Sequence, residues 1–138
     1  MAYVTPNIFG RILTIPVSLA QTELRRGKDI QIMQFDLKLG QIFELRALNL
    51  HVLKVLTPGV TPEYVNRSLG LASLGVYEGP MLTGALALVK GSQVGVTQFN
   101  PWMVRRFVSP GTYTVLISNN TRNVDLSVSA MGALKLYI

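Results

Sequence analysis

The sequence predicts an all-β protein, a sandwich of about eight antiparallel strands with one short helix and an N-terminal arm. Apolar and polar residues alternate with a period of two over much of the chain, which is typical of half-buried strands. Gly and Pro, present 12 and 7 times among 138 residues, separate these runs at short intervals. Many short strands joined by Gly/Pro turns favour a sandwich or a barrel.

The first part of the chain predicts an arm followed by two strands. Residues 1–10 show no clear period, so we expect an N-terminal arm before a single β-sandwich domain over 11–138. A β-rich strand is expected over 11–19. Pro16 places it at a sheet edge or a bulge because proline cannot donate to a ladder. After a polar connection, residues 29–39 alternate clearly, with Leu39 on the apolar face.

The next strand is expected over 42–56. Its apolar residues lie on one face up to Ala47, and beyond Leu48 they lie on both faces. A strand that is apolar on both faces is covered on both faces, by another sheet or by a neighbouring subunit. Leu50 and Val52 are therefore candidate interface residues.

The middle of the chain predicts one short helix and several short strands. A turn at 57–59 is followed by Thr61 as N-cap and Pro62 at the first helical position, which favours one or two helical turns up to about Ser68. Further strands are expected over 69–77, 84–90, 93–99 and 102–108.

The last third predicts a hairpin with strands over 112–118 and 124–131, and Gly132 is expected to mark a bulge. The run Ser-Pro-Gly-Thr-Tyr-Thr-Val-Leu-Ile-Ser-Asn-Asn-Thr over 109–121 looks like a late hairpin of jelly-roll domains. The expected architecture is therefore a jelly-roll-like β-sandwich.

With its arm, its compact size and its few charges, the whole chain resembles the decoration (cement) proteins of tailed-phage capsids. This resemblance implies a small β-rich protein, often a trimer, that sits on the outer capsid surface and clamps neighbouring capsid subunits. It implies location on the virion of a bacteriophage.

The composition limits the classes of function. Charged residues make up 14% of the chain, against about 25% in an ordinary soluble domain, which predicts a surface that is covered in an assembly. The chain has no cysteine, and its single histidine, His51, lies mid-strand without an obvious nucleophile. The acidic residues form no recognisable pair or metal-binding loop. We therefore expect no enzyme activity, no metal and no cofactor.

The charge pattern and the termini also carry expectations about partners and location. The net charge of +6 comes from scattered basic residues, whereas nucleic-acid binders more often concentrate them on one face. The uncharged stretches are too short and too rich in Gly and Pro to span a bilayer. No signal peptide is recognisable, so we expect synthesis in the host cytoplasm. For the same reason, the Asn-x-Ser/Thr glycosylation sequences at Asn66 and Asn119 are treated as coincidental.

The cluster at 102–107 contains residue types that are enriched at interface hot spots. The alternative is that Trp102 and Phe107 belong to the core and the arginines to a solvated edge, and the sequence leaves both possibilities open. With the apolar residues of the arm and of the two-sided strand, the candidate interface residues are Tyr3, Ile8, Phe9, Leu50, Val52, Trp102, Arg105, Arg106 and Phe107.

Two functions follow from these patterns. The first is a non-enzymatic structural protein that forms a homo-oligomer, with a trimer favoured, and binds a major capsid protein or another shell protein. The alternative is a carbohydrate- or receptor-binding sandwich, which would expose several aromatic rings in one patch. The rings considered for that patch are Tyr64, Tyr77, Trp102 and Tyr113.

Overall fold

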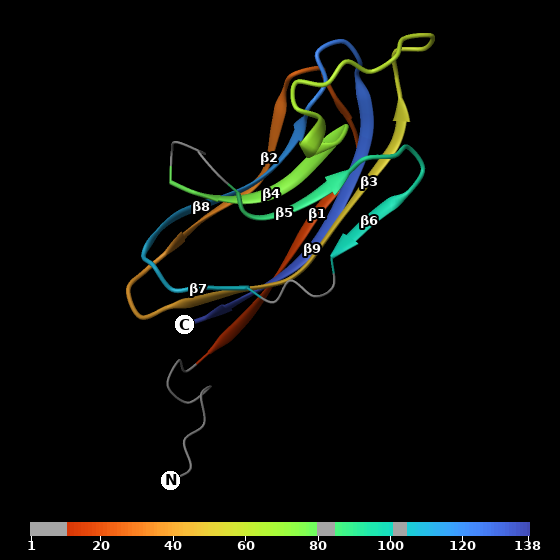
Figure 1. The fold of residues 1–138 in the computed structure, drawn as a ribbon. Coiled ribbons are helices and arrows are strands. Elements are labelled where there is room, and N and C mark those ends of the chain that lie inside the picture. Colours follow the sequence, from red (N-terminus) through yellow and green to blue (C-terminus); the bar gives the residue numbers. More distant parts are fainter. Residues whose placement is uncertain (1–10, 80–84, 101–104) are drawn as a thin grey trace.

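A computed structural model describes residues 11–79, 85–100 and 105–138, with only the backbone at 99, 100 and 105. Two sheets pack face to face (Figure 1). The described residues form one 3-10 helix and nine strands, which are β1 (Ile12–Leu24), β2 (Asp29–Leu37), β3 (Ile42–Val55), η1 (Arg67–Leu69), β4 (Ala72–Glu78), β5 (Ala85–Gly91), β6 (Thr97–Asn100), β7 (Arg105–Phe107), β8 (Gly111–Asn119) and β9 (Leu126–Tyr137).

The strand order is that of a jelly roll. One sheet has the order β1-β9-β3-β6, with β7 also on β3, and the other has the order β2-β8-β4-β5. Because β6 and β7 pair with successive parts of β3, they act as two halves of one interrupted edge strand. Counted this way, eight antiparallel strands form two four-stranded sheets, as in double-sheet jelly rolls. The predicted fold class is confirmed.

The edge position of β1 explains how it accommodates a proline. β1 pairs with β9 on one side, and Pro16 lies opposite Ala133 in that ladder. The expectation of an edge strand at Pro16 is therefore confirmed. The strand is longer than expected and continues through a register shift between Leu19 and Thr22 to Leu24.

A register shift in β3 corrects the interpretation of its two-sided apolar pattern. The shift lies between Leu45 and Ala47, and an extra residue in a strand reverses the parity of everything after it. Leu48, Leu50 and Val52 therefore face the core and are 0% exposed. Leu50 and Val52 are buried by the opposite sheet of the same chain, so their assignment as interface residues was wrong.

Gly132 lies across from this shift. A Cβ atom at Gly132 would lie 2.5 Å from the carbonyl oxygen of Ala47, so only glycine lets the two backbones approach this closely. The irregularity expected at Gly132 is therefore present, but the extra residue is in β3.

Four aromatic rings fill the core between the sheets near the turns at 38–41 and 108–110. Phe35 and Phe43 stack with ring centroids 3.7 Å apart, and Phe107 and Tyr113 complete the cluster. The Tyr113 hydroxyl donates a 2.6 Å hydrogen bond to the carbonyl oxygen of Ser109, which satisfies its polar group. Phe107 is therefore a core residue.

The helix expected over 61–68 is largely absent. The segment instead bonds to the loop that follows β8: Val65 N donates to the Asn120 carbonyl oxygen and Arg122 N donates to the Glu63 carbonyl oxygen, both at 2.8 Å. These long-range bonds compete with helical ones, and only η1 remains, capped by the side chain of Asn66. Tertiary pairing overrides the local start signal at Thr61.

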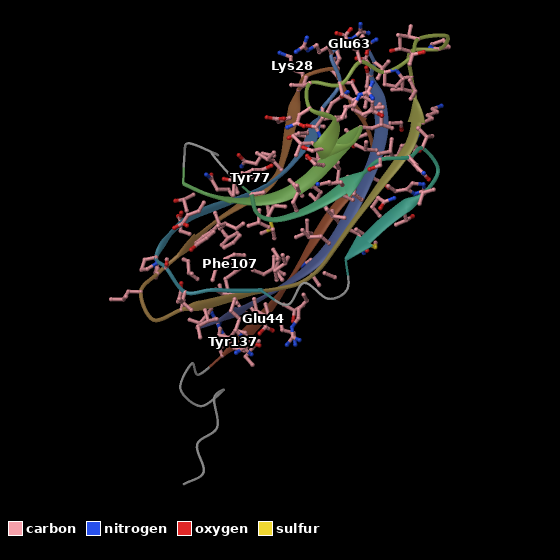
Figure 2. The ribbon with its side chains drawn as sticks, viewed as in Figure 1. Lys28, Glu44, Glu63, Tyr77, Phe107 and Tyr137 are labelled. Atoms are coloured by element: carbon pink, nitrogen blue, oxygen red, sulfur yellow. The ribbon has the colours of Figure 1, made fainter. Side chains whose placement is uncertain are left out.

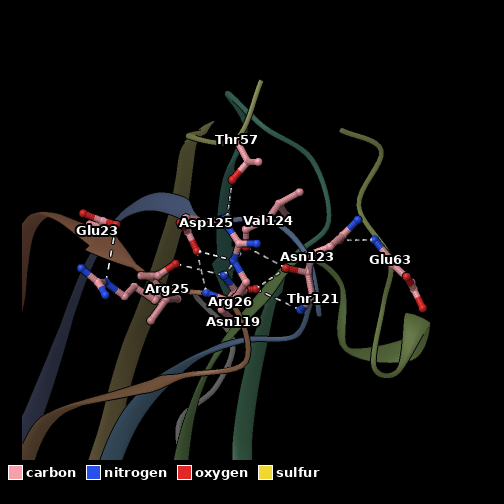
Figure 3. A network of polar contacts seen from close by, with 11 residues as sticks. Glu23, Arg25, Arg26, Thr57, Glu63, Asn119, Thr121, Asn123, Val124 and Asp125 are labelled. Carbon is pink, nitrogen blue, oxygen red and sulfur yellow. Dashed lines mark hydrogen bonds and ion pairs between the residues drawn. The ribbon is translucent and has the colours of Figure 1, made fainter. Parts of the chain in front are cut away.

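A buried asparagine organises the end of the sandwich opposite the turns at 38–41 and 108–110 (Figure 3). The Nδ2 group of Asn119 donates to the carbonyl oxygens of Leu24 and Val124, at 3.0 and 2.9 Å. Its Oδ1 accepts from the backbone N–H and the hydroxyl of Thr121. Nearby, Arg26 donates through its side chain and its backbone to Asp125. Asn119 is thus a structural amide whose polar atoms are all used.

Candidate assembly surface

Two tight turns lie side by side at one end of the sandwich, at the left of Figure 1. The turn at 38–41 joins β2 to β3, and the turn at 108–110 joins β7 to β8. They are adjacent because β2 pairs with β8 and β3 pairs with β7. Gln41 closes the first turn: its backbone N–H donates to the Lys38 carbonyl oxygen, and its side-chain oxygen accepts from Lys38 N.

Each turn carries an exposed apolar side chain. Leu39 is 87% exposed and Val108 is 60% exposed. Leu39 lies beyond the end of β2, so its expected place on the buried face of that strand was wrong. Single exposed apolar residues are common, whereas large contiguous apolar patches mark interaction sites. These two side chains lie on neighbouring turns. We call the turns 38–41 and 108–110 the apolar end.

A buried carboxylate with three cations lies on the outer face of the β1-β9-β3-β6 sheet. Glu44 on β3 is 0% exposed and lies opposite Arg106 on β7 and Lys135 on β9. Arg106 Nε donates to Glu44 Oε2 at 2.7 Å, and the Tyr137 hydroxyl donates to Oε1 at 3.2 Å. Arg46 forms a second ion pair with Oε1. Figure 2 places Glu44 and Tyr137 together at the lower end of the view.

The net charge of Glu44 and the basic residues around it is positive. Burial by itself raises the pKa of Glu44, but the hydrogen bond from Arg106 and the charges of Arg46 and Arg106 outweigh it and lower the pKa. The Glu44 carboxylate is then paired with two guanidinium groups, and Lys135 lies opposite it in the β3–β9 ladder. The side chains of Arg46 and Arg106 are 41% and 68% exposed, so they keep donors available for acidic groups of a partner. We call Arg46, Arg106 and Lys135 the basic cluster.

Glu44 makes stability depend on pH. Its folded-state pKa is lowered from the ordinary value of 4.5, so its contribution is present above 4.5 and is lost as the pH falls through the folded-state pKa. We expect Glu44→Gln to lower the free energy of unfolding at neutral pH by about 1–3 kcal/mol, the worth of hydrogen bonds to a charged group. The variant should lose less stability on acidification than the wild type.

Urea unfolding at neutral and acidic pH measures both effects. Glu23→Gln is the matched control, because Glu23 forms an exposed ion pair with Arg25 at 3.8 Å, which is worth little. Equal acid sensitivity of the wild type and Glu44→Gln would contradict the assignment.

The structure separates the residues that the sequence grouped around position 105. Arg106 points out from β7 into the basic cluster, whereas Phe107 points into the core. Arg105 pairs with Leu45 through its backbone. Tyr3, Ile8, Phe9 and Trp102 lie outside the described residues.

The sequence did not nominate Leu39, Val108, Arg46 or Lys135. The available signal was an apolar residue within the Lys38-Leu39-Gly40 turn, where polar residues are usual.

The aromatic patch expected for a carbohydrate-binding module does not form from the described rings. Tyr113 is 1% exposed in the core. Tyr77 lies over Gly75 on β4, whereas Tyr64 is half-buried in the loop between β3 and β4 and bridges to Thr121. These three rings therefore offer no common stacking surface.

Within the described ranges, no three His, Cys, Asp or Glu side chains gather in a way that could hold a metal ion. The same residues contain no helix with the length and apolar character needed to cross a membrane.

No family model matches the sequence, and no curated protein matches it. Solved structures do match. VP2 of infectious bursal disease virus, in a subviral particle, superposes with a TM-score of 0.54 at 13% identity, over 91% of this chain and 32% of VP2. The chain shares its fold with part of this viral protein.

A second structure, of the Gx strain of infectious bursal disease virus, gives a TM-score of 0.55 at 14% identity, with the same coverage. The Gt strain gives 0.51 at 12% identity. The chain spans about a third of the length of these proteins, since 32% of each is covered. At such identities the likeness concerns the fold, and it agrees with the jelly-roll strand order described above.

Proposed function

We propose that this chain is a non-enzymatic structural protein of a virus particle. The observation that carries the proposal is the jelly-roll strand order, shared with VP2 over 91% of this chain. Jelly rolls serve several functions, including capsid and lectin domains. The capsid role is favoured here because the chain is poor in charge and has an apolar end next to a basic cluster.

The chain acts as a decoration protein that forms a homo-oligomer, with a trimer favoured, and binds the outer surface of a shell made by a major capsid protein. The apolar end supplies contact area between copies of this chain, and the basic cluster selects and orients an acidic partner on the shell. Residues 1–10, with Tyr3, Ile8 and Phe9, reach a neighbouring subunit or the shell. Trp102 and Arg105 remain candidate contact residues in this proposal.

A double variant tests the role of the apolar end. Leu39→Asp with Val108→Asp places two charges on the proposed contact and is expected to weaken self-association roughly tenfold or more, as loss of a buried interface contact does. Sedimentation velocity over a concentration series measures the change. Circular dichroism should show an unchanged fold, because both side chains are exposed in the single chain.

Val60→Asp is the matched control. Val60 is also an exposed apolar residue, 39% accessible, but it lies in the loop between β3 and β4 at the other end of the sandwich. If the control weakens association as much as the double variant, or if the double variant associates like the wild type, the apolar end is not the contact.

A further inference from the structure

A shallow groove of about 370 Å³ lies on the outer face of the β1-β9-β3-β6 sheet. The strand register builds it in two rows. His51 lies between Thr97 and Ser129 in one row, and Met131 lies between Asn49 and Ser18 in the next. The described residues that line it are Ser18, Leu19, Ala20, Asn49, His51, Thr97, Ser129, Ala130 and Met131. Its volume falls in the range of about 300–1,000 Å³ found for small-molecule sites.

The polar side chains of this groove are free to bind a ligand. Across the described part of the chain, five of them make no side-chain hydrogen bond or ion pair with another residue, although nearby Gln21 and Ser127 bond to each other. The five are Ser18, Asn49, His51, Thr97 and Ser129. Hydroxyl and amide groups offer both donors and acceptors, and an imidazole ring adds further hydrogen-bonding nitrogens. The groove therefore presents a concentrated set of hydrogen-bonding groups on rigid strands.

The lining restricts the chemical class of the ligand. Its described residues include no Asp, Glu, Lys or Arg, so a phosphate or another charged ligand would find no carboxylate, ammonium or guanidinium partner there. A wholly apolar ligand would leave five polar groups without water or partner, which is costly. Met131, 61% exposed at the centre of the groove, adds an apolar contact. A neutral sugar has adjacent hydroxyl groups and an apolar ring face, so it matches the polar side chains and the methionine of this groove.

We propose that this groove binds a neutral saccharide, with Asn49 and His51 bonding to its hydroxyl groups and Met131 contacting its ring face. The site is built by residues on the four neighbouring strands β1, β9, β3 and β6. The groove does not include the apolar end, so the saccharide proposal and the capsid proposal can each fail without affecting the other.

Nuclear magnetic resonance titration of the 138-residue chain tests the proposal. The probes are the neutral methyl glycosides of glucose, galactose, mannose and N-acetylglucosamine. At least one is expected to shift the Met131 methyl and Asn49 side-chain amide signals in a saturable way. Asn49→Ala and, separately, Met131→Ala should weaken that binding about tenfold, as the loss of one good contact does.

Gln31→Ala is the matched control, because Gln31 is an exposed amide on the outer face of the other sheet, opposite Leu116 in the β2–β8 ladder. It should leave glycoside binding unchanged. The proposal is overturned if no glycoside moves the groove signals, or if both groove variants bind like the wild type. It is also overturned if the groove signals shift with protein concentration in the absence of sugar, since a second copy would then cover the groove.

Discussion

Replacing Asn119 with aspartate is expected to lower the free energy of unfolding by more than about 3 kcal/mol at neutral pH, because the change buries an unpaired charge. Asn119 is 4% exposed. Its Nδ2 group donates to the carbonyl oxygens of Leu24 and Val124. Aspartate removes both donors and sets a negative charge against two carbonyl oxygens, while keeping the shape of the side chain.

The pH dependence of Asn119→Asp shows whether the loss of stability comes from the buried charge or from a change in side-chain shape. A carboxyl group buried without a cation has a raised folded-state pKa, so the penalty should shrink as acid protonates it and restores one donor. Urea unfolding of the variant and the wild type at neutral and mildly acidic pH measures this difference. Asn66→Asp is the control, because Asn66 is an exposed N-cap, where aspartate serves equally well. Equal costs at the two positions would contradict the role assigned to Asn119.

Phe43→Ala is expected to destabilise the fold by about 3–5 kcal/mol, the usual cost of removing a large buried ring. Phe43 is 0% exposed and lies between Phe35 of the opposite sheet and Phe107 of β7. Its removal leaves a cavity between the sheets, directly behind the apolar end. The same variant should therefore loosen the turns at 38–41 and 108–110.

Chemical unfolding measures this cost, and hydrogen exchange at the two turns measures the loosening. Phe43→Leu is the comparison, because it keeps most of the volume and should cost less than about 2 kcal/mol. If alanine and leucine cost the same, packing of the ring cluster is not what stabilises this end of the sandwich.

The sequence predicted those parts of the fold that depend on local signals. Pro16 marked an edge strand because a proline lacks the donor that a central strand needs. The two strands β8 and β9 were recognisable because their alternation is regular and their connecting loop is polar. The expected hairpin between them was wrong, because β8 pairs with β2 and β4 in one sheet and β9 pairs with β1 and β3 in the other. Together with the spacing of Gly and Pro, these signals were sufficient for a jelly-roll-like sandwich.

The features that escaped prediction depend on contacts between distant parts of the chain. The register shift next to Arg46 reverses the parity of β3, and nothing in the strand's own pattern distinguishes this from a strand covered on both faces. The helix at 61–68 gave way to bonds with the loop after β8. Glu44 is buried on an outer sheet face because residues from β7 and β9 cover it, which no local pattern reveals.

The candidate surface was predicted only in part. Arg106 was nominated as an interface residue, and the structure places it at the surface next to Glu44. Leu50, Val52 and Phe107 were nominated because apolar and aromatic residues are common in interfaces, but the same residue types also fill cores. Only the three-dimensional register tells these two uses apart.

The molecular mass of the wild-type chain in solution tests the central claim most directly. Light scattering coupled to size-exclusion chromatography, at micromolar concentration, is predicted to give a multiple of the 15.2 kDa chain mass, with a trimer favoured. A well-behaved monomer over the whole micromolar range would contradict the proposal that this jelly roll is an assembling structural protein.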